Sequence, residues 1–187
     1  MKIPTIAEPL ALARMYASAS LNFTYSYGGW EDQDKQDAQY KRIITGQLGQ
    51  NFLASFCHLN NIPFKVDNSH YSKSDDFDIV IKGYKFDVKT SNTNLPCQVN
   101  AALENKNIDA FYFFNTDKNY TYIEPLGFIS KKKYLEKAKF VSEGEKIPNT
   151  NFIQRFKNGS YFLDASELSE KGLLPLINIE TKKVEVV

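Results

Sequence analysis

Residues 74–90 read SDDFDIVIKGYKFDVKT, and this stretch decides how the chain folds. Its two halves, residues 77–81 and 84–90, are rich in the β-branched and aromatic side chains that favour strands. Lys82 and Gly83 stand between them, and a two-residue connection that contains glycine is typical of a β-hairpin. The stretch therefore predicts two antiparallel strands joined by a tight turn.

The second strand of this hairpin carries charge on one face only. Side chains alternate along a strand, so Phe86 and Val88 point into a core while Asp87 and Lys89 share the opposite face. A tight turn also brings Asp78, at the start of the first strand, close to Asp87. Two converging carboxylates repel each other unless a divalent cation neutralises them. Because all their ligand atoms are oxygen, Mg²⁺ or Mn²⁺ is favoured over zinc.

Helical and strand periodicities surround the hairpin. Upstream, apolar residues that step by four predict one buried stripe on a long helix over Asp37–Asn60. The pattern of residues 151–157 does not decide between a helix and a strand. The chain is expected to form a single α/β domain over residues 1–187, with its core at about 37–135. The other expected strands are Ile62–Val66, Ala110–Phe114, Thr121–Glu124 and Tyr161–Leu163, and the other expected helices are Glu8–Ser18, Gln98–Asn107 and Ser130–Lys139, the last with a serine N-cap.

The balance of charge excludes a protein that binds nucleic acid through bulk charge alone. Lys and Arg number 23 against 22 Asp and Glu, which leaves a net charge of +1. Only three of the basic residues are arginines, Arg14, Arg42 and Arg155. Lysine is a point charge suited to phosphate, whereas arginine is the usual bidentate reader of guanine. Any nucleic-acid contact is therefore expected to be mainly with the backbone.

Cysteine content and hydropathy limit the cellular settings that we expect for this protein. Cys57 and Cys97 lie far apart in sequence and the chain has only two histidines, so a zinc site built from Cys and His is nearly excluded. Two thiols and no signal peptide favour a reducing setting, the cytoplasm of a bacterial or phage-infected cell. No apolar run approaches the roughly 20 residues that a membrane span requires.

The hairpin and its surroundings resemble the PD-(D/E)XK nuclease superfamily, whose restriction-endonuclease-like core has a mixed central sheet flanked by helices in the order αβββαβ. Asp78 matches the first acidic position, and Asp87 and Lys89 match the second acid and the lysine. The segment around Gln50 is similar to the family's opening helix, and residues 109–130 resemble those of small bacteriophage and bacterial endonucleases. The resemblance covers about Lys41 to Leu135.

The resemblance implies a metal-dependent deoxyribonuclease, an endonuclease that leaves 5′-phosphate and 3′-hydroxyl ends. Asp78, Asp87 and the main-chain carbonyl of Val88 would hold Mg²⁺, for which Mn²⁺ would substitute. Lys89 would lie beside the attacking water, lower its pKa and stabilise the developing negative charge. Asp76 stays open as an alternative first acid.

Gln50 departs from the family pattern, because many members have a glutamate at the corresponding position. An amide oxygen can ligate a metal but brings no charge, so Mg²⁺ is expected to bind more weakly and a one-metal mechanism is favoured. Gln50 also keeps a second hypothesis open, an inactive DNA-binding or assembly subunit that retains the nuclease fold. A third hypothesis is a structure-selective nuclease that acts on branched or single-stranded DNA.

The expected partner is DNA, and cutting both strands of a duplex favours a homodimer. Residues near the proposed site, together with one lysine-rich helix start, are the candidates for DNA contact. They are Lys73, Lys82, Lys85, Ser91, Asn92, Lys131, Lys132 and Lys133.

Overall fold

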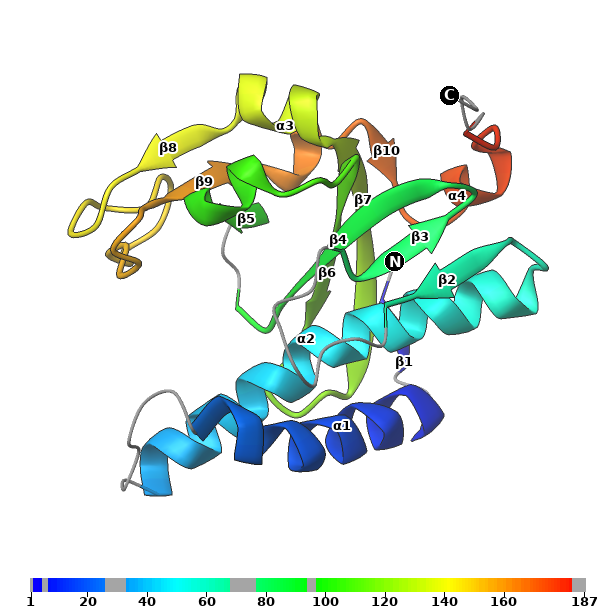
Figure 1. Cartoon of the computed structure of the whole chain (residues 1–187). Coiled ribbons are helices and arrows are strands. Elements are labelled where there is room, and N and C mark those ends of the chain that lie inside the picture. Colours follow the sequence, from blue (N-terminus) through cyan, green and yellow to red (C-terminus); the bar gives the residue numbers. More distant parts are fainter. Residues whose placement is uncertain (1, 5–6, 26–32, 68–76, 94–96, 183–187) are drawn as a thin grey trace.

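The computed structural model describes residues 2–4, 7–25, 33–67, 77–93 and 97–182. Over this part of the chain it is an α/β protein with a mixed, curled central sheet flanked by helices (Figure 1). The sequence also predicts a loop at residues 25–30, a polar loop at residues 67–76 and a tail or edge strand at residues 181–187, and these segments fall largely outside the described residues.

The central sheet has seven strands in the order β1-β7-β6-β4-β3-β2, with β10 pairing on β7 as well. All its pairs are antiparallel except β4 with β6, which run parallel. The parallel pair lies in the middle of the sheet, where β6 is buried along almost its whole length and β4 is buried at Phe86, Asp87 and Val88. The strands are β1 (Ile3–Pro4), β2 (Phe64–Val66), β3 (Ile79–Ile81), β4 (Tyr84–Ser91), β6 (Ala110–Thr116), β7 (Tyr122–Ser130) and β10 (Glu170–Lys171).

The long helix α2 (Gln33–Leu59) covers one face of this sheet, and α1 (Ala7–Tyr25) packs against α2 (Figure 1). The predicted stripe on α2 is confirmed, since Ile44, Leu48 and Phe52 are buried in the core beneath the sheet. Gly49 lets the helix approach closely, because a Cβ there would collide with the Thr90 hydroxyl on β4. α2 is therefore held directly against the strand that carries Asp87 and Lys89.

The opposite face packs against α3 (Lys131–Lys137) and a second, three-stranded sheet in the order β5-β9-β8. Tyr134 of α3 is fully buried there, and its hydroxyl donates to the main-chain oxygens of Cys97 at 2.8 Å and Tyr161 at 2.9 Å. The predicted serine N-cap is confirmed, because Ser130 accepts from the Lys133 N–H. The small sheet comprises β5 (Cys97–Asn100), β8 (Lys139–Val141) and β9 (Ser160–Leu163).

The helix expected over Gln98–Asn107 is wrong. Residues 97–100 form β5, and only residues 101–105 coil, as the 3-10 helix η1 (Ala101–Asn105). Cys97 and Val99 alternate with polar neighbours and are both buried against α3 and β9, so tertiary packing selects the strand. Asn100 then ends the strand by accepting from the Ala102 N–H. Among the described residues between β4 and β6, a strand and a 3-10 helix therefore stand where the order αβββαβ has its second α-helix.

The C-terminal part of the chain returns to the central sheet. A short 3-10 helix precedes β10, and a short α-helix follows it near the turn of the β3–β4 hairpin (Figure 1). None of the helices among the described residues is long and apolar enough to cross a membrane. The 3-10 helix before β10 is η2 (Ala165–Glu167), and the α-helix after it is α4 (Pro175–Asn178).

Candidate active site

The tight turn of the hairpin is confirmed and fixes the position of the acidic residues. Lys82 and Gly83 both have positive φ, 50° and 87°, as the two-residue turn of a twisted hairpin requires. The register pairs Ile79 with Phe86, so Asp78 and Asp87 lie together at the end of the hairpin opposite the turn. We call this the open end of the hairpin.

Asp78 is anchored to the second strand rather than projecting freely from it. Its N–H donates to the Phe86 carbonyl at 3.0 Å, and Phe86 is also the register partner of Ile79. Asp78 and Ile79 thus both face Phe86, which is the two-against-one pattern of a β-bulge. Its carboxylate Oδ2 accepts from the Val88 N–H at 2.5 Å. The Asp78 side chain therefore lies over the backbone that joins Asp87 to Lys89.

Asp87 and Lys89 form an ion pair on the face of β4 that the sequence predicted. The Asp87 side chain is only 7% exposed, and among the described residues the sole partner of its Oδ1 is the Lys89 ammonium. Lys89 is 32% exposed. A buried carboxylate with so few partners is costly in an apolar setting, so removal of the Lys89 ammonium would leave an uncompensated buried charge.

The charges around Lys89 keep it protonated. Burial of the ammonium acts to lower its pKa, and Arg42 acts in the same direction by repulsion. Asp87 and Asp78 attract the charged form and outweigh both effects, so the pKa of Lys89 is raised above its ordinary value. Lys89 is therefore a fixed positive charge at neutral pH.

Gln50 lies behind this site and makes structural hydrogen bonds. It is 4% exposed, and its amide Nε2 donates to the main-chain oxygen of Asp78 at 3.1 Å. Its Oε1 accepts from Gln47 Nε2 at 3.1 Å. Gln50 thus ties α2 to the bulge that positions Asp78, and its amide oxygen is already engaged by another side chain.

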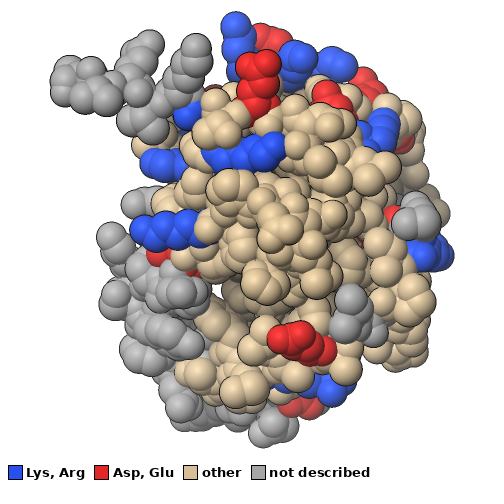
Figure 2. Space-filling view, turned by 90° about the vertical axis from the view of Figure 1, so that its right-hand side faces the viewer, with Lys and Arg blue, Asp and Glu red and all other residues tan. Residues whose placement is uncertain are grey.

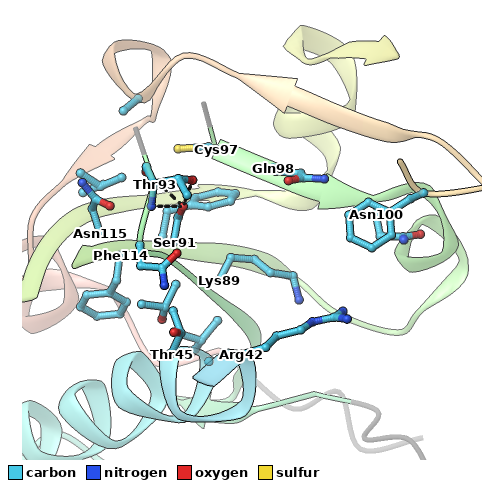
Figure 3. A pocket seen from close by; sticks show the side chains of 18 of the residues that line it. Arg42, Thr45, Lys89, Ser91, Thr93, Cys97, Gln98, Asn100, Phe114 and Asn115 are labelled. Atoms are coloured by element: carbon cyan, nitrogen blue, oxygen red, sulfur yellow. Dashed lines mark hydrogen bonds between the residues drawn. The ribbon is translucent and has the colours of Figure 1, made fainter. Parts of the chain in front are cut away.

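A pocket of about 1100 Å³ opens beside the ion pair, between α2, the end of β4 and the small sheet (Figure 3). Lys89 and Arg42 extend into it from neighbouring elements and point in a similar direction in Figure 3. Lys41 also lines it, whereas Asp164 is its only acidic lining residue among those described. The wall formed by α2 and β4 is therefore positively charged.

The donor set suits a hard cation, although it is small. Among the described residues no three His, Cys, Asp or Glu side chains cluster closely enough to hold a metal ion. Asp78 and Asp87 supply carboxylate oxygens, and the buried Asp87 Oδ1 has no partner other than an ammonium. Such an oxygen fits the oxygen-only preference of Mg²⁺, with the Val88 carbonyl close by in sequence.

The predicted DNA-contact residues fall into separate places. Ser91 and Asn92 line the pocket next to Lys89. Lys85 shares the face of β4 with Asp87, and its ammonium lies 5.6 Å from the centre of the Phe77 ring. Lys82 lies at the turn, where its ammonium donates to the carbonyls of Ile177 and Ile179 at 2.7 and 2.8 Å.

The lysine-rich start of α3 lies away from the pocket, and none of its three lysines lines it. Lys131 donates to the Lys106 carbonyl at 2.7 Å, while Lys132 and Lys133 are exposed. Lys73 falls outside the described residues. The structure therefore brings Ser91 and Asn92 to the site together with Lys89, and it leaves Lys82 and residues 131–133 elsewhere.

The sequence analysis did not identify Lys41 and Arg42 as site residues. Arg42, Gly46 and Gln50 are spaced by four, so they share one face of α2. The signal that could have identified this side of α2 was a polar face with a glycine, next to the apolar stripe of the helix. Gly46 has open space at its missing Cβ and lines the pocket, in contrast to the tightly packed Gly49.

The described residues of the face that carries α4 and the hairpin turn form no continuous basic surface (Figure 2). Figure 2 shows this face with a broad uncharged centre, while Lys and Arg side chains gather along one edge and at the top. Phosphate contact through that face would lack the stripe of positive charge that backbone recognition uses. The pocket wall formed by α2 and β4 is the stronger candidate for an anionic ligand.

Comparison of the sequence with models of protein families gave no match, and comparison with curated proteins gave none either. A function for this site therefore depends on its own residues and geometry.

Proposed function

We propose that this chain is a Mg²⁺-dependent DNA endonuclease with a restriction-endonuclease-like core. The observation that carries the proposal is the meeting of Asp78, Asp87 and Lys89 at the open end of one hairpin, beside a positively charged pocket. The order α2, β2, β3, β4 and then β6 parallel to β4 also supports it. Such a core arranges two acids and a lysine on adjacent strands in the same way.

The residues of the site suit hydrolysis of a phosphodiester. Lys41 and Arg42 would bind the non-bridging oxygens of phosphate groups, which are strong acceptors for charged donors. Lys89 stays protonated, so it would orient water and stabilise negative charge rather than remove a proton. Asp78 and Asp87 would hold Mg²⁺, which when bound would neutralise phosphate charge and make a coordinated water more acidic.

A second candidate function is an inactive DNA-binding subunit. Gln50 favours it, because this side chain supports the Asp78 backbone through one amide atom and is bonded to Gln47 through the other. With two carboxylates the site would bind Mg²⁺ weakly. Gln50→Glu tests this directly. A wild type without activity and a Gln50→Glu variant that gains Mg²⁺-dependent cleavage would establish the second candidate over the first.

The decisive experiment incubates supercoiled plasmid with the protein and Mg²⁺ or Mn²⁺, with an EDTA control. We expect cleavage with either metal, and a fall of at least about a hundredfold in Asp87→Asn and Lys89→Met, the scale on which removing a charge-stabilising group slows catalysis. Glu136→Gln and Lys137→Met on the exposed face of α3 are the matched controls. Asp87→Asn and Lys89→Met variants that cut as fast as these controls would refute the site.

The remaining parts of the proposal concern products, assembly and setting. Ligation of the cleaved plasmid would test for 5′-phosphate and 3′-hydroxyl ends, and light scattering would test for the homodimer.

A reducing, cytoplasmic setting fits the two thiols, which are unpaired and buried. Burial raises the pKa of Cys57 to about 11 and that of Cys97 to about 12, which suppresses thiolate chemistry at neutral pH.

A further inference from the structure

The wall of the pocket opposite α2 is formed in part by residues 142–159, the connection between β8 and β9, which we call the arm. The arm is a bonded hairpin rather than a loose loop. The Gly144 N–H donates to the Gln154 carbonyl and the Gln154 N–H donates to the Glu145 carbonyl, both at 2.9 Å, and Lys146 pairs with Ile153. Figure 1 shows it extending from the small sheet on the same side as the N-terminal half of α2.

Phe156 projects from the arm into the pocket lining although 38% of it is exposed. Its position is fixed by backbone contacts. Gln154 is buried and its Oε1 accepts from the N–H groups of Arg155 and Phe156, at 2.7 and 3.1 Å. The Phe156 carbonyl in turn accepts from the Gly159 N–H at 2.8 Å. A partly exposed aromatic ring on a hydrogen-bonded backbone at a polar pocket is suited to stacking against a flat ligand.

The chemistry of the pocket changes from one wall to the other. Lys41, Arg42 and Lys89 form the basic wall, and Phe156 belongs to the opposite wall. Side-chain amides, each of which offers both a donor and an acceptor, make up much of the remaining lining. They are Asn92, Gln98, Asn100, Asn115, Asn149 and Asn158.

We propose that this pocket holds an unpaired segment of nucleic acid, and the proposal rests on the nuclease function above. The phosphates of the segment lie along the basic wall, and a base stacks on Phe156 with its edge facing the amides. Positive charge along a backbone path combined with an aromatic platform is the pattern by which single strands are bound. The protein thus selects unpaired over duplex nucleic acid.

The size of the pocket supports an unpaired ligand. At about 1100 Å³ it is comparable to pockets that enclose small molecules, not to a surface that accepts a double helix. In a duplex the base edges and faces are stacked and paired, so a base reaches such a pocket only after it leaves the stack. A single strand, a loop or a flap presents its bases without that cost.

The test measures binding separately from cleavage. Fluorescence anisotropy in EDTA compares a labelled single strand of about 12 nucleotides with a duplex of the same sequence, a length within the range that single-strand sites cover. We expect the single strand to bind at least about tenfold more tightly than the duplex. Phe156→Ala should weaken single-strand binding by about tenfold, the scale of one lost stacking contact.

Matched variants separate the pocket from the rest of the surface. Phe152→Ala removes a more exposed aromatic ring from the same arm, outside the pocket lining, and should leave binding unchanged. Arg42→Gln should weaken binding and reduce its salt dependence, whereas Arg14→Gln on the exposed face of α1 should do neither.

Equal affinity for the two ligands, or equal effects of Phe156→Ala and Phe152→Ala, would overturn the inference. The nuclease proposal would survive that result if the plasmid were still cut. Conversely, a preference for the single strand that depends on Phe156, in a protein that never cuts, would support the pocket and refute the nuclease.

Discussion

The two ends of the β3–β4 hairpin each carry a lysine and use it in opposite ways. At the turn, the Lys82 ammonium donates to the main-chain carbonyls of Ile177 and Ile179 at the end of α4, and the Lys182 N–H donates to the Lys82 carbonyl. At the open end, the Asp87 carboxylate faces the Lys89 ammonium beside a large pocket, and Asp78 lies over the same strand.

This difference shows how charge is divided between structure and chemistry. A lysine that donates to two carbonyls completes the hydrogen bonding of a helix end and has less capacity left for a ligand. A buried carboxylate whose oxygen meets only an ammonium keeps that capacity, because a cation or a phosphate can rearrange the pair. Only the open end is organised for binding, although both ends are lysine-rich in sequence.

The largest expected effect is at the open end. Lys89→Met leaves the Asp87 carboxylate buried and without its cation, and we expect a loss of about 2 kcal/mol of unfolding free energy. This is less than the roughly 3–5 kcal/mol of a fully buried pair, because Lys89 is partly exposed. The Asp87→Asn/Lys89→Met double variant should recover part of the loss. Urea unfolding of wild type, Asp87→Asn, Lys89→Met and the double variant gives a double-mutant cycle. Purely additive losses of unfolding free energy would contradict a coupled pair.

A smaller effect is expected at the turn. Lys82→Met removes two hydrogen bonds from a charged donor to partly exposed carbonyls, so we expect a loss of about 1 kcal/mol of unfolding free energy. Plasmid cleavage should stay within about twofold of wild type, since the turn is far from the catalytic end. Lys65→Met on the neighbouring strand β2, where the side chain is exposed, is the control. A Lys82 variant with normal stability and lost cleavage would place this lysine in the substrate site instead.

The sequence predicted those parts of the fold that depend on local patterns. The hairpin turn at Lys82-Gly83, the buried stripe of α2 and the serine cap at Ser130 each follow from residues close together in the chain, and each is confirmed. The strand β5 was missed because its partner β9 lies some 60 residues later, as the register of Cys97 with Leu163 shows. No local pattern distinguishes such a strand from a short helix.

The candidate site shows the same limit. Asp78, Asp87 and Lys89 could be placed from one hairpin, and their proximity is seen in the structure. The pocket could not, because its walls come from α2, the end of β4 and an arm more than 50 residues further along the chain. Phe156 in particular stood in a segment without a clear period, and only the small sheet brings it opposite Arg42.

The smallest expected effect concerns pH and distinguishes a fixed charge at the open end from a proton acceptor. Because the folded pKa of Lys89 is raised, the stability from its pair with Asp87 is fully present below the unfolded lysine pKa of about 10.4. It is lost as pH rises through the folded pKa. The gap in unfolding free energy between wild type and Lys89→Met should therefore stay constant from about pH 6 to 9 and narrow only above about pH 10.4. Urea unfolding across this range measures the gap. A gap that instead widened between about pH 7 and 9 would mean that the folded pKa of Lys89 is lowered and that Lys89 is neutral in the folded protein, because the unfolded state would then bind more protons than the folded state. Its role beside the attacking water would then change from charge stabilisation to proton removal.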